Sequence, residues 1–251
     1  MEKLLPNKIF YDELADNYDE MISFDNAVEK KKNLLKKFIN LDTITAADIG
    51  CGSGVDSIAL SMVEKKVTAF DPSTEMMKVA KVNAKKMNVS VEFHNSAADQ
   101  IPEEHNNKFD LVISLGNTFS NIPHEKFNDS IKRCYDILKL GGQLLIQVLN
   151  YKNILQDKQR IVSITESKNK FFIRFYDFYN EQIAFNILTF SKERTSDYKL
   201  SSTKIYPYQL ENFDSGLTNS GFKTFLFYGD LKLSEFISSQ SKDLIVLTNK
   251  E

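Results

Sequence analysis

The chain has 251 residues, a formal net charge of −2 and 42% hydrophobic residues. This length suits one α/β domain with an insertion, and the near-neutral charge gives no general attraction to nucleic acid. The two cysteines form no disulfide framework, the amino terminus lacks an apolar signal-peptide core, and no apolar run approaches the roughly 18 residues of a membrane span. We therefore expect a cytoplasmic protein with no membrane partner. Its three histidines lack metal-ligand spacing, so we predict no metal.

The first part of the chain reads as helices followed by alternating strands and helices. Residues 1–40 are expected to form a helical lid, because Tyr11, Leu14, Ala15 and Tyr18 recur at helical spacing. Strands are then expected at residues 46–49, 67–70, 89–94, 108–114 and 143–149, with helices between them. Strands that alternate with helices predict a doubly wound, mostly parallel sheet.

The pattern changes after residue 150. The segments 161–165, 171–179, 182–191 and 199–206 look like strands with no room for helices between them. Residues 152–206 are therefore expected to form an antiparallel β insertion after strand five, which could pair with another subunit in a homodimer. A helix at 208–220 and strands at 222–227 and 243–248 would complete a seven-stranded sheet within a single domain, residues 1–251.

A glycine loop follows the first expected strand. Asp48 and Ile49 lead into Gly50-Cys51-Gly52-Ser53-Gly54, and Asp71 ends the second expected strand, seventeen residues after Gly54. Ligands of doubly wound sheets bind beyond the carboxyl ends of the strands, and a carboxylate about 20 residues after the glycines can hold a ribose. The third glycine comes one residue too early for the dinucleotide pattern G-x-G-x-x-G, and no phosphate-binding G-x-x-x-x-G-K-[ST] is present. The pattern favours a cofactor that carries adenosine.

Several segments together resemble the class I S-adenosylmethionine-dependent methyltransferases. The glycine loop, the D-P-S-T-E-M segment at 71–76, F-D-L-V-I-S at 109–114 and K-L-G-G at 139–142 all match that family's pattern. The resemblance implies a Rossmann-like fold, S-adenosylmethionine as cofactor and methyl transfer as activity. The cofactor-binding residues that it implies are Tyr11, Tyr18, Gly50, Cys51, Gly52, Asp71, Pro72, Met76, Ala97, Ala98, Leu115 and Gly116.

Some of these roles have structural alternatives. Met76 would pack on the adenine or simply belong to the core. The family often has an acidic residue at the position of Ala97, so Asp99 or backbone groups would replace it as partners of the adenine amine. Tyr11 and Tyr18 resemble the lid helix of small-molecule methyltransferases, where a tyrosine face favours a cation, and the alternative is helix packing.

The expected acceptor side resembles the glycine and sarcosine N-methyltransferase group. L-G-N-T-F at 115–119 is similar to that group's L-G-N-S-F, and N-Y-K-N-I-L at 150–155 to its N-Y-D-x-I-L. That group has an arginine at the position of Leu149, and a leucine cannot bind a carboxylate, so glycine is a poor substrate. The insertion offers Arg174 instead, which would bind an acidic substrate or pair with Asp177 or Glu181.

Four residues are the catalytic candidates. Asn117 would orient the acceptor, Tyr18 and Tyr176 could accept a proton, as could Tyr11 or His124, and Arg174 could hold the substrate. The leading hypothesis is transfer of a methyl group from S-adenosylmethionine to a small-molecule acceptor, with an amine nitrogen as nucleophile, by in-line displacement. The alternatives are an O-methyltransferase for a small carboxylate or hydroxyl and a non-catalytic binding protein. A nicotinamide oxidoreductase is disfavoured by the glycine spacing, and no nucleic-acid partner is expected.

Overall fold

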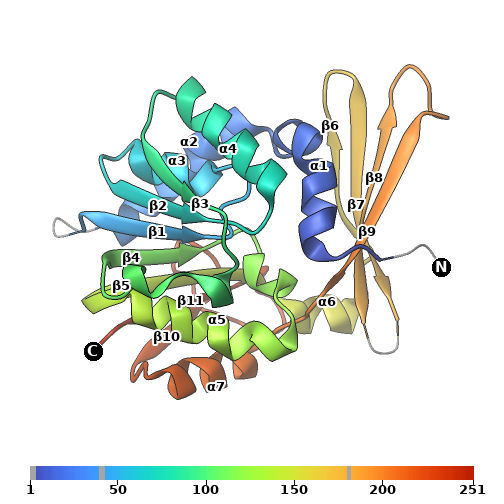
Figure 1. The fold of residues 1–251 in the computed structure, drawn as a ribbon. Helices are drawn as coiled ribbons and strands as arrows, with labels where there is room; N and C mark the ends of the chain where they lie inside the picture. Colours follow the sequence, from blue (N-terminus) through green and yellow to red (C-terminus); the bar gives the residue numbers. More distant parts are fainter. Residues whose placement is uncertain (1–3, 40–42, 180–181) are drawn as a thin grey trace.

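The computed structural model describes residues 4–39, 43–179 and 182–251, and these form two β-sheets (Figure 1). The larger sheet has seven strands in the order β10-β11-β5-β4-β1-β2-β3, and the smaller has four in the order β6-β7-β8-β9. β1 (Thr45–Ile49), β2 (Lys66–Phe70), β3 (Val91–His94), β4 (Phe109–Ser114) and β5 (Leu138–Leu149) run parallel. β11 (Asp243–Asn249) is antiparallel to β5, and β10 (Phe225–Tyr228) is antiparallel to β11. The predicted doubly wound, mostly parallel seven-stranded sheet is confirmed.

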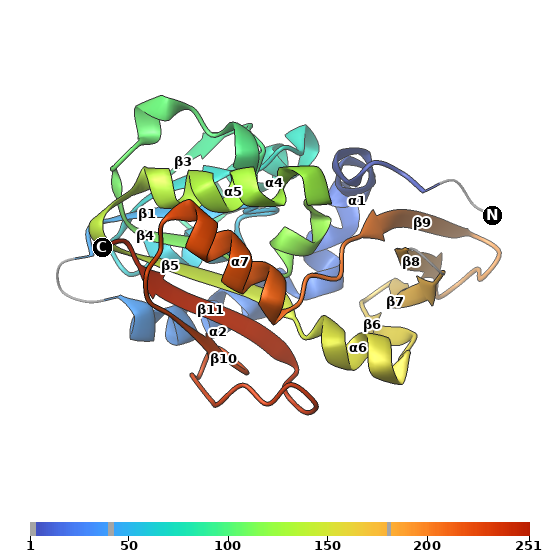
Figure 2. The same cartoon turned by 90° about the horizontal axis from the view of Figure 1, so that it is seen from below.

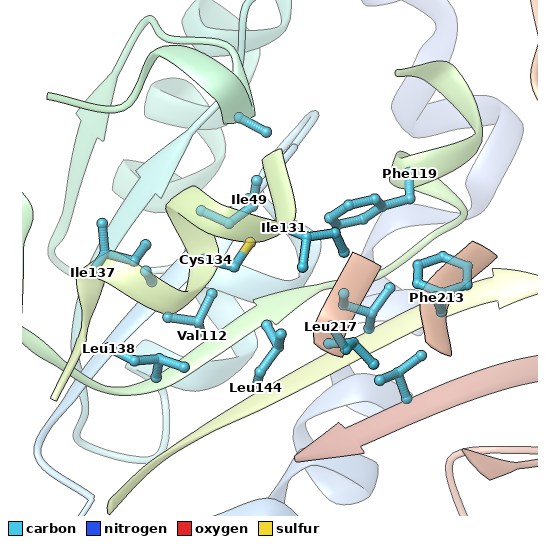
Figure 3. Packing of buried hydrophobic residues seen from close by; sticks show 14 of the residues in the cluster. Ile49, Val112, Phe119, Ile131, Cys134, Ile137, Leu138, Leu144, Phe213 and Leu217 are labelled. Atoms are coloured by element: carbon cyan, nitrogen blue, oxygen red, sulfur yellow. The ribbon is translucent and has the colours of Figure 1, made fainter. Parts of the chain in front are cut away.

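Helices cover both faces of the large sheet. α2 (Phe24–Leu35), α3 (Val55–Ser61) and α4 (Thr74–Lys86) pack on one face, and α5 (His124–Ile137) and α7 (Leu210–Ser220) on the other. Side chains alternate across the strands, so Val112 and Leu144 enter the α5–α7 layer while Leu111 and Leu145 enter the opposite layer. Figure 3 shows Ile131, Phe213 and Leu217 of the two helices pointing at the strands. Because the large sheet is buried on both faces, the ends of its strands, where the site lies, are held in place.

The small sheet lies beside the large one, with α1 (Asn7–Ile22) between them (Figures 1 and 2). It contains β6 (Ile161–Glu166), β7 (Lys170–Phe178), β8 (Ile183–Ser191) and β9 (Tyr198–Ile205), all paired antiparallel. These strands agree with the antiparallel segments predicted within 152–206. The chain enters the sheet through the short helix α6 (Tyr151–Asp157), which the sequence reading did not anticipate.

Short 3-10 turns complete the connections: η1 (Lys36–Phe38), η2 (Ala98–Gln100), η3 (Glu103–His105) and η4 (Thr118–Asn121). The described part of the predicted lid is two helices, α1 and α2, and only α1 lies against the small sheet. Phe10, Leu14 and Ala15 of α1 pack with Phe172 of β7 and Ile187 of β8. This contact joins the two sheets through a single helix.

Candidate functional site

The glycine loop lies at the carboxyl end of β1 and has the tight geometry that its sequence predicts. Gly50 N–H and Cys51 N–H both donate to the carbonyl oxygen of Phe70, at 2.7 and 3.1 Å, which ties the tips of β1 and β2 together. Gly50 has φ +73°, and a Cβ on it would lie 2.2 Å from Cγ2 of Thr118. Only glycine fits this position. Gly52 also has positive φ, but a Cβ there would meet nothing within 4 Å.

Asp71 is held rigidly at the tip of β2. Its Oδ2 accepts from Gly52 N–H at 2.9 Å and its Oδ1 from Ser73 N–H at 2.8 Å. Burial raises the pKa of the Asp71 carboxyl, while these two bonds act to lower it. A carboxylate has about four acceptor sites, so Asp71 keeps room for donors from a ligand.

Asp12 of α1, which sequence reasoning missed, binds the first turn of α4. Ser73 caps α4 by accepting from Met76 N–H at 3.1 Å. Its hydroxyl donates to Oδ1 of Asp12 at 2.6 Å, and the same oxygen accepts from Glu75 N–H. Asp12 therefore fixes the predicted lid helix next to the acidic tip of β2. No local motif marks this long-range contact.

Acidic side chains gather around the glycine loop. Asp48 of β1 is buried and accepts from the hydroxyl of Ser57 at 2.5 Å. Burial, together with the nearby charge of Asp56, raises the pKa of the Asp48 carboxyl. Asp71 adds to this effect. Such an environment favours a positively charged ligand, because an opposite charge stabilises the ionised carboxylates.

The turn after β4 forms the second wall of the site. Gly116 and Asn117 both have positive φ, at 66° and 70°, and Gly116 N–H donates to Oε1 of Gln147 at 2.7 Å. Asn117 Oδ1 accepts from Leu149 N–H and from the Ser120 hydroxyl, each at 3.0 Å. Its Nδ2 donates to the Tyr151 hydroxyl at 2.7 Å. The Asn117 amide thus links β4, β5 and α6, and its effect on an acceptor would pass through Tyr151.

Four tyrosines from three elements converge near this turn: Tyr11 and Tyr18 of α1, Tyr151 of α6 and Tyr176 of β7. The rings of Tyr11 and Tyr18 lie 6.4 Å apart, and the Tyr11 hydroxyl donates to Oδ1 of Asn121 at 3.3 Å. Tyr176 and Tyr151 are hydrogen-bonded through their side chains. Burial raises the pKa of all four hydroxyls, so they are neutral at physiological pH.

Tyr151 is the functional candidate that the sequence reading did not select. It is 1% exposed and lies between Asn117 and Tyr176 in one hydrogen-bonded chain. The only available signal was its place directly after strand five, in the segment that resembles N-Y-D.

Arg174 does not pair with Asp177, one of its two predicted structural partners. Asp177 forms its ion pair with Arg160, and it lies on the opposite face of β7 from Arg174. The alternative partner, Glu181, lies outside the described residues. Arg174 Nε donates to the hydroxyl of Ser163 at 2.6 Å, and its charge lowers the pKa of Tyr18 against the larger effect of burial. Within the described ranges, no ion pair involves Arg174.

Other predicted residues lie near the site but offer less. The Cys51 side chain packs against Met77, with sulfur atoms 3.7 Å apart, so Cys51 offers mainly backbone. Met76 is 1% exposed and packs in the cluster around Phe10, which fits a core role; its adenine contact stays a prediction. Four other predicted cofactor residues have side chains without polar atoms, so they could contact a cofactor only by packing or through their backbone: Pro72, Ala97, Ala98 and Leu115.

Two further candidates are engaged elsewhere. Asp99, the proposed substitute at the adenine edge, pairs with Lys126 at 2.9 Å. His124, which the sequence offered as a proton acceptor, packs its ring against Tyr206 and Tyr208 at 5.0 and 5.1 Å. Within residues 4–39, 43–179 and 182–251, no three His, Cys, Asp or Glu side chains gather as metal ligands. No helix in these ranges is long and apolar enough to cross a membrane.

The part of the chain around the glycine loop is similar to known proteins. Residues 46–142 match the family model described as Methyltransferase domain. A ubiquinone biosynthesis O-methyltransferase of Pseudomonas syringae pv. tomato is 28% identical over 125 residues, half of each protein. One from Xanthomonas campestris pv. campestris is 30% identical over 103 residues, 41% of this chain and 42% of that protein. The chain thus spans at most about half the length of these curated relatives.

Solved structures extend the likeness to nearly the whole chain. An S-adenosylmethionine-dependent methyltransferase from Clostridium acetobutylicum superposes with a TM-score of 0.78 at 18% identity, over 95% of this chain and 98% of that one. The CcbJ methyltransferase from Streptomyces caelestis gives 0.78 at 15% identity, over 96% and 97%. The chain has the Rossmann-like fold of class I S-adenosylmethionine-dependent methyltransferases. Residues 46–142 match a methyltransferase domain, and the narrower grouping with glycine and sarcosine N-methyltransferases is not shown.

The residues of the site fit S-adenosylmethionine. The open space beside Gly52 lets backbone approach a ligand, and Asp71 has acceptor capacity for the two ribose hydroxyls. The acidic groups at the strand tips suit a sulfonium cation, and so do the ring faces of Tyr11 and Tyr18.

Proposed function

We propose that this chain, with its methyltransferase domain at residues 46–142, transfers a methyl group from S-adenosylmethionine to a small-molecule acceptor, with an amine nitrogen as the nucleophile. One observation carries the proposal. The fixed carboxylate of Asp71 and the tyrosine cluster around Asn117 lie at the carboxyl ends of β2 and β4, the two strands that flank β1 in one sheet. A cofactor site and an acceptor site would then face each other.

The residues would act by position more than by covalent chemistry. The bound cofactor supplies the methyl group and its own leaving group. Asp71 and the backbone at Gly52 would hold the nucleoside, and the chain Asn117–Tyr151–Tyr176 would hold the acceptor. Correct orientation of two reactants can supply about 7–11 kcal/mol of a barrier. Buried Tyr151 and Tyr176, with the partly buried Tyr11 and Tyr18, would also help to keep water from the site.

The four tyrosines around the Asn117 turn offer no base, which favours an amine acceptor. The four tyrosine hydroxyls have raised pKa values and cannot accept a proton at neutral pH. An amine can lose its proton to water before binding, whereas an alcohol, which is a much weaker acid, needs a base at the site. A carboxylate oxygen needs no base and is the second candidate. The names of similar proteins support oxygen as well as nitrogen as the nucleophile. The curated relatives above are named O-methyltransferases, and the structural neighbour KedS8, with a TM-score of 0.62, is named a sugar N-methyltransferase.

Arg174 supports an acceptor that also carries an anionic group. Its side chain lies on the face of β7 that bears Tyr176, and its charge acts on Tyr18 and Tyr176. Among the described residues, Ser163 uses Nε of Arg174 and no hydrogen bond uses its two terminal nitrogens, which could form a bidentate pair with a carboxylate.

We expect Arg174→Gln to raise KM for an anionic acceptor at least tenfold, because a charged hydrogen bond contributes about 1.5–3 kcal/mol. Cofactor affinity would stay within threefold. Arg194→Gln, which removes an exposed arginine in the connection between β8 and β9, is the matched control. An unchanged KM in Arg174→Gln would remove this residue from the acceptor site.

Transfer of tritium from methyl-labelled S-adenosylmethionine to a pool of cell metabolites tests the function. We expect a labelled small molecule that survives mild base, as an N-methyl group does. Label released by base as volatile methanol would indicate a carboxyl methyl ester and replace nitrogen by oxygen. Cofactor binding without transfer to any metabolite would contradict catalysis and indicate a binding protein. Asp71→Ala is the negative control.

A further inference from the structure

Asp12, in the first half of α1, is linked through one residue to the carboxylate that is expected to hold the ribose. Its Oδ1 accepts from the Ser73 hydroxyl at 2.6 Å and from Glu75 N–H at 3.1 Å. The backbone N–H of the same Ser73 donates to Oδ1 of Asp71 at 2.8 Å. Ser73 therefore donates its hydroxyl to one carboxylate and its N–H to the other.

The position of Ser73 controls the orientation of the Asp71 side chain. Ser73 is 1% exposed, and its hydroxyl oxygen also accepts from Met76 N–H at 3.1 Å as the cap of α4. Because this hydroxyl both donates and accepts, its direction is fixed. A shift of Ser73 would turn its N–H away from Asp71, since only one residue separates the two. Asp12 therefore supports Asp71 from outside the sheet.

The Asp12 carboxylate is itself held in place. Its Oδ2 pairs with Nζ of Lys8 at 2.7 Å, one turn earlier in α1, and its side chain is 21% exposed. Partial burial acts to raise the pKa of the Asp12 carboxyl, but the hydrogen bonds from Lys8, Ser73 and Glu75 lower it below its ordinary value. Asp12 is thus ionised at neutral pH, which suits its place at the positive end of the α4 dipole.

The residue before Asp12 contacts the opposite wall of the site. The Tyr11 hydroxyl donates to Oδ1 of Asn121 at 3.3 Å, and Nδ2 of Asn7 donates to the carbonyl oxygen of Asn121 at 2.5 Å. Figure 1 shows α1 between α4 and the small sheet. One helix therefore reaches the tip of β2 through Asp12 and the turn after β4 through Asn7 and Tyr11.

We propose that Asp12 is a positioning residue for the cofactor: through Ser73 it holds the Asp71 carboxylate in the orientation that binds both ribose hydroxyls. The inference rests on the proposed function, because it takes Asp71 as the partner of the ribose of S-adenosylmethionine. Two hydroxyls on neighbouring carbon atoms require a carboxylate at a defined angle, and the hydrogen bonds that support a binding group set how exactly it is placed. Asp12 acts through Ser73 and does not touch the cofactor.

Discrimination between ribose and deoxyribose tests this role. Titration calorimetry on each variant compares the Kd for S-adenosylhomocysteine with the Kd for its 2′-deoxy analogue. We expect wild type to bind the ribose form at least tenfold more tightly, because the analogue lacks one donor to the Asp71 carboxylate. Asp12→Ala should raise the Kd for the ribose form about tenfold and reduce the discrimination below threefold. Asp12→Asn keeps a side-chain oxygen for Ser73 and Glu75 and should retain the wild-type discrimination.

Asp19→Ala is the matched control on the same helix. Oδ2 of Asp19 accepts from Nδ2 of Asn83, near the end of α4, at 2.7 Å. This variant loses a similar hydrogen bond between α1 and α4 but keeps the link to Asp71, so its discrimination should stay at least tenfold. Ser73→Ala breaks the link to Asp12 from the other side. It should match Asp12→Ala, and the double variant should lose no further discrimination.

Thermal melting shows which variants are folded, and Ser73→Ala carries the same test if Asp12→Ala is not. Equal weakening of both ligands in Asp12→Ala, with discrimination kept, would overturn the positioning role, because a purely structural defect lowers both affinities alike. A wild-type chain that binds S-adenosylhomocysteine without discrimination would overturn the inference together with the ribose assignment of Asp71. A wild-type chain that binds neither ligand would overturn the proposed function itself.

Discussion

The two sheets of this chain build the two halves of the site in different ways. The seven-stranded sheet is packed on both faces, and its strand tips form the cofactor half mainly from backbone: Gly50, Gly52 and the N–H groups that hold Asp71. The four-stranded sheet is packed on one face and contributes side chains, Arg174 and Tyr176, to the acceptor half. The half built from backbone accepts few other residues at its glycine positions. In the half built from side chains, a substitution can change which substrate is bound.

The largest expected effect is that of Gly50→Ala. A Cβ at this position would overlap Thr118 at 2.2 Å, and φ +73° strains any other residue. Strain and overlap together should cost about 2–5 kcal/mol and distort the loop. We expect cofactor affinity to fall more than 100-fold, measured by titration calorimetry.

Gly141→Ala is the matched control, because Gly141 has similar φ (+78°) and open space around the added Cβ, and it lies near the start of β5, away from the glycine loop. We expect a loss of about 1–2 kcal/mol of stability from the backbone alone. Equal losses of cofactor affinity in the two variants would show that overlap with Thr118 is not the reason why position 50 requires glycine.

Asp71→Ala should rank second. It removes the acceptor for Gly52 N–H and Ser73 N–H as well as the expected ribose contacts. A hydrogen bond to a charged group contributes about 1.5–3 kcal/mol, so the loss of even one ribose contact should lower affinity for S-adenosylmethionine at least tenfold. Asp99→Ala, which breaks the pair with Lys126, should leave affinity unchanged. Unaltered binding in Asp71→Ala would count against the ribose assignment.

Asn117→Ala should affect the acceptor half alone. Without the amide, the Tyr151 hydroxyl and Leu149 N–H lose their partners and the turn loosens. We expect kcat to fall about 10- to 100-fold while the cofactor Kd changes less than threefold, because the glycine loop is untouched. Asn117→Asp keeps the acceptor for Leu149 and should retain more turnover. Equal losses in turnover and cofactor affinity would refute the separation of the two halves.

Asp48→Asn has the smallest effect and concerns stability. Burial raises the pKa of Asp48 in the folded chain above its unfolded value, so folding favours the protonated form. Wild type therefore loses this contribution as pH rises from about 4 toward the raised pKa. Asparagine imitates the protonated acid, so the variant should be more stable by about 1–3 kcal/mol at pH 8 and equal to wild type near pH 4. Urea titration at both pH values measures this; a gain that persists at pH 4 would have another cause.

The local structure of the proposed cofactor half could be read from the sequence because its signals are local, and cofactor binding by these residues stays a prediction. Three glycines in five residues, Asp71 at a strand end and the capping Ser73 are all readable from neighbours in the chain. The doubly wound, mostly parallel arrangement followed from the alternation of strands and helices, and the small sheet from closely spaced strand-like runs. Element ends shifted by a few residues: β5 begins at Leu138, five residues before the expected start.

The acceptor half could not be predicted in the same way. Tyr151 and Tyr176 meet only after α6 and β7 fold over the strand ends. Asp177 was a reasonable partner for Arg174 by sequence distance, but strand alternation puts it on the other face, where Arg160 reaches it. Such contacts depend on tertiary packing, which no local pattern records.

A crystal structure of the chain with S-adenosylhomocysteine bound would test the central claim most directly. We predict that both ribose hydroxyls lie within hydrogen-bond distance of the Asp71 carboxylate and that the sulfur atom faces the turn at Asn117. A nucleoside bound away from the tips of β1 and β2, or a sulfur atom pointing away from the tyrosine cluster, would contradict the account.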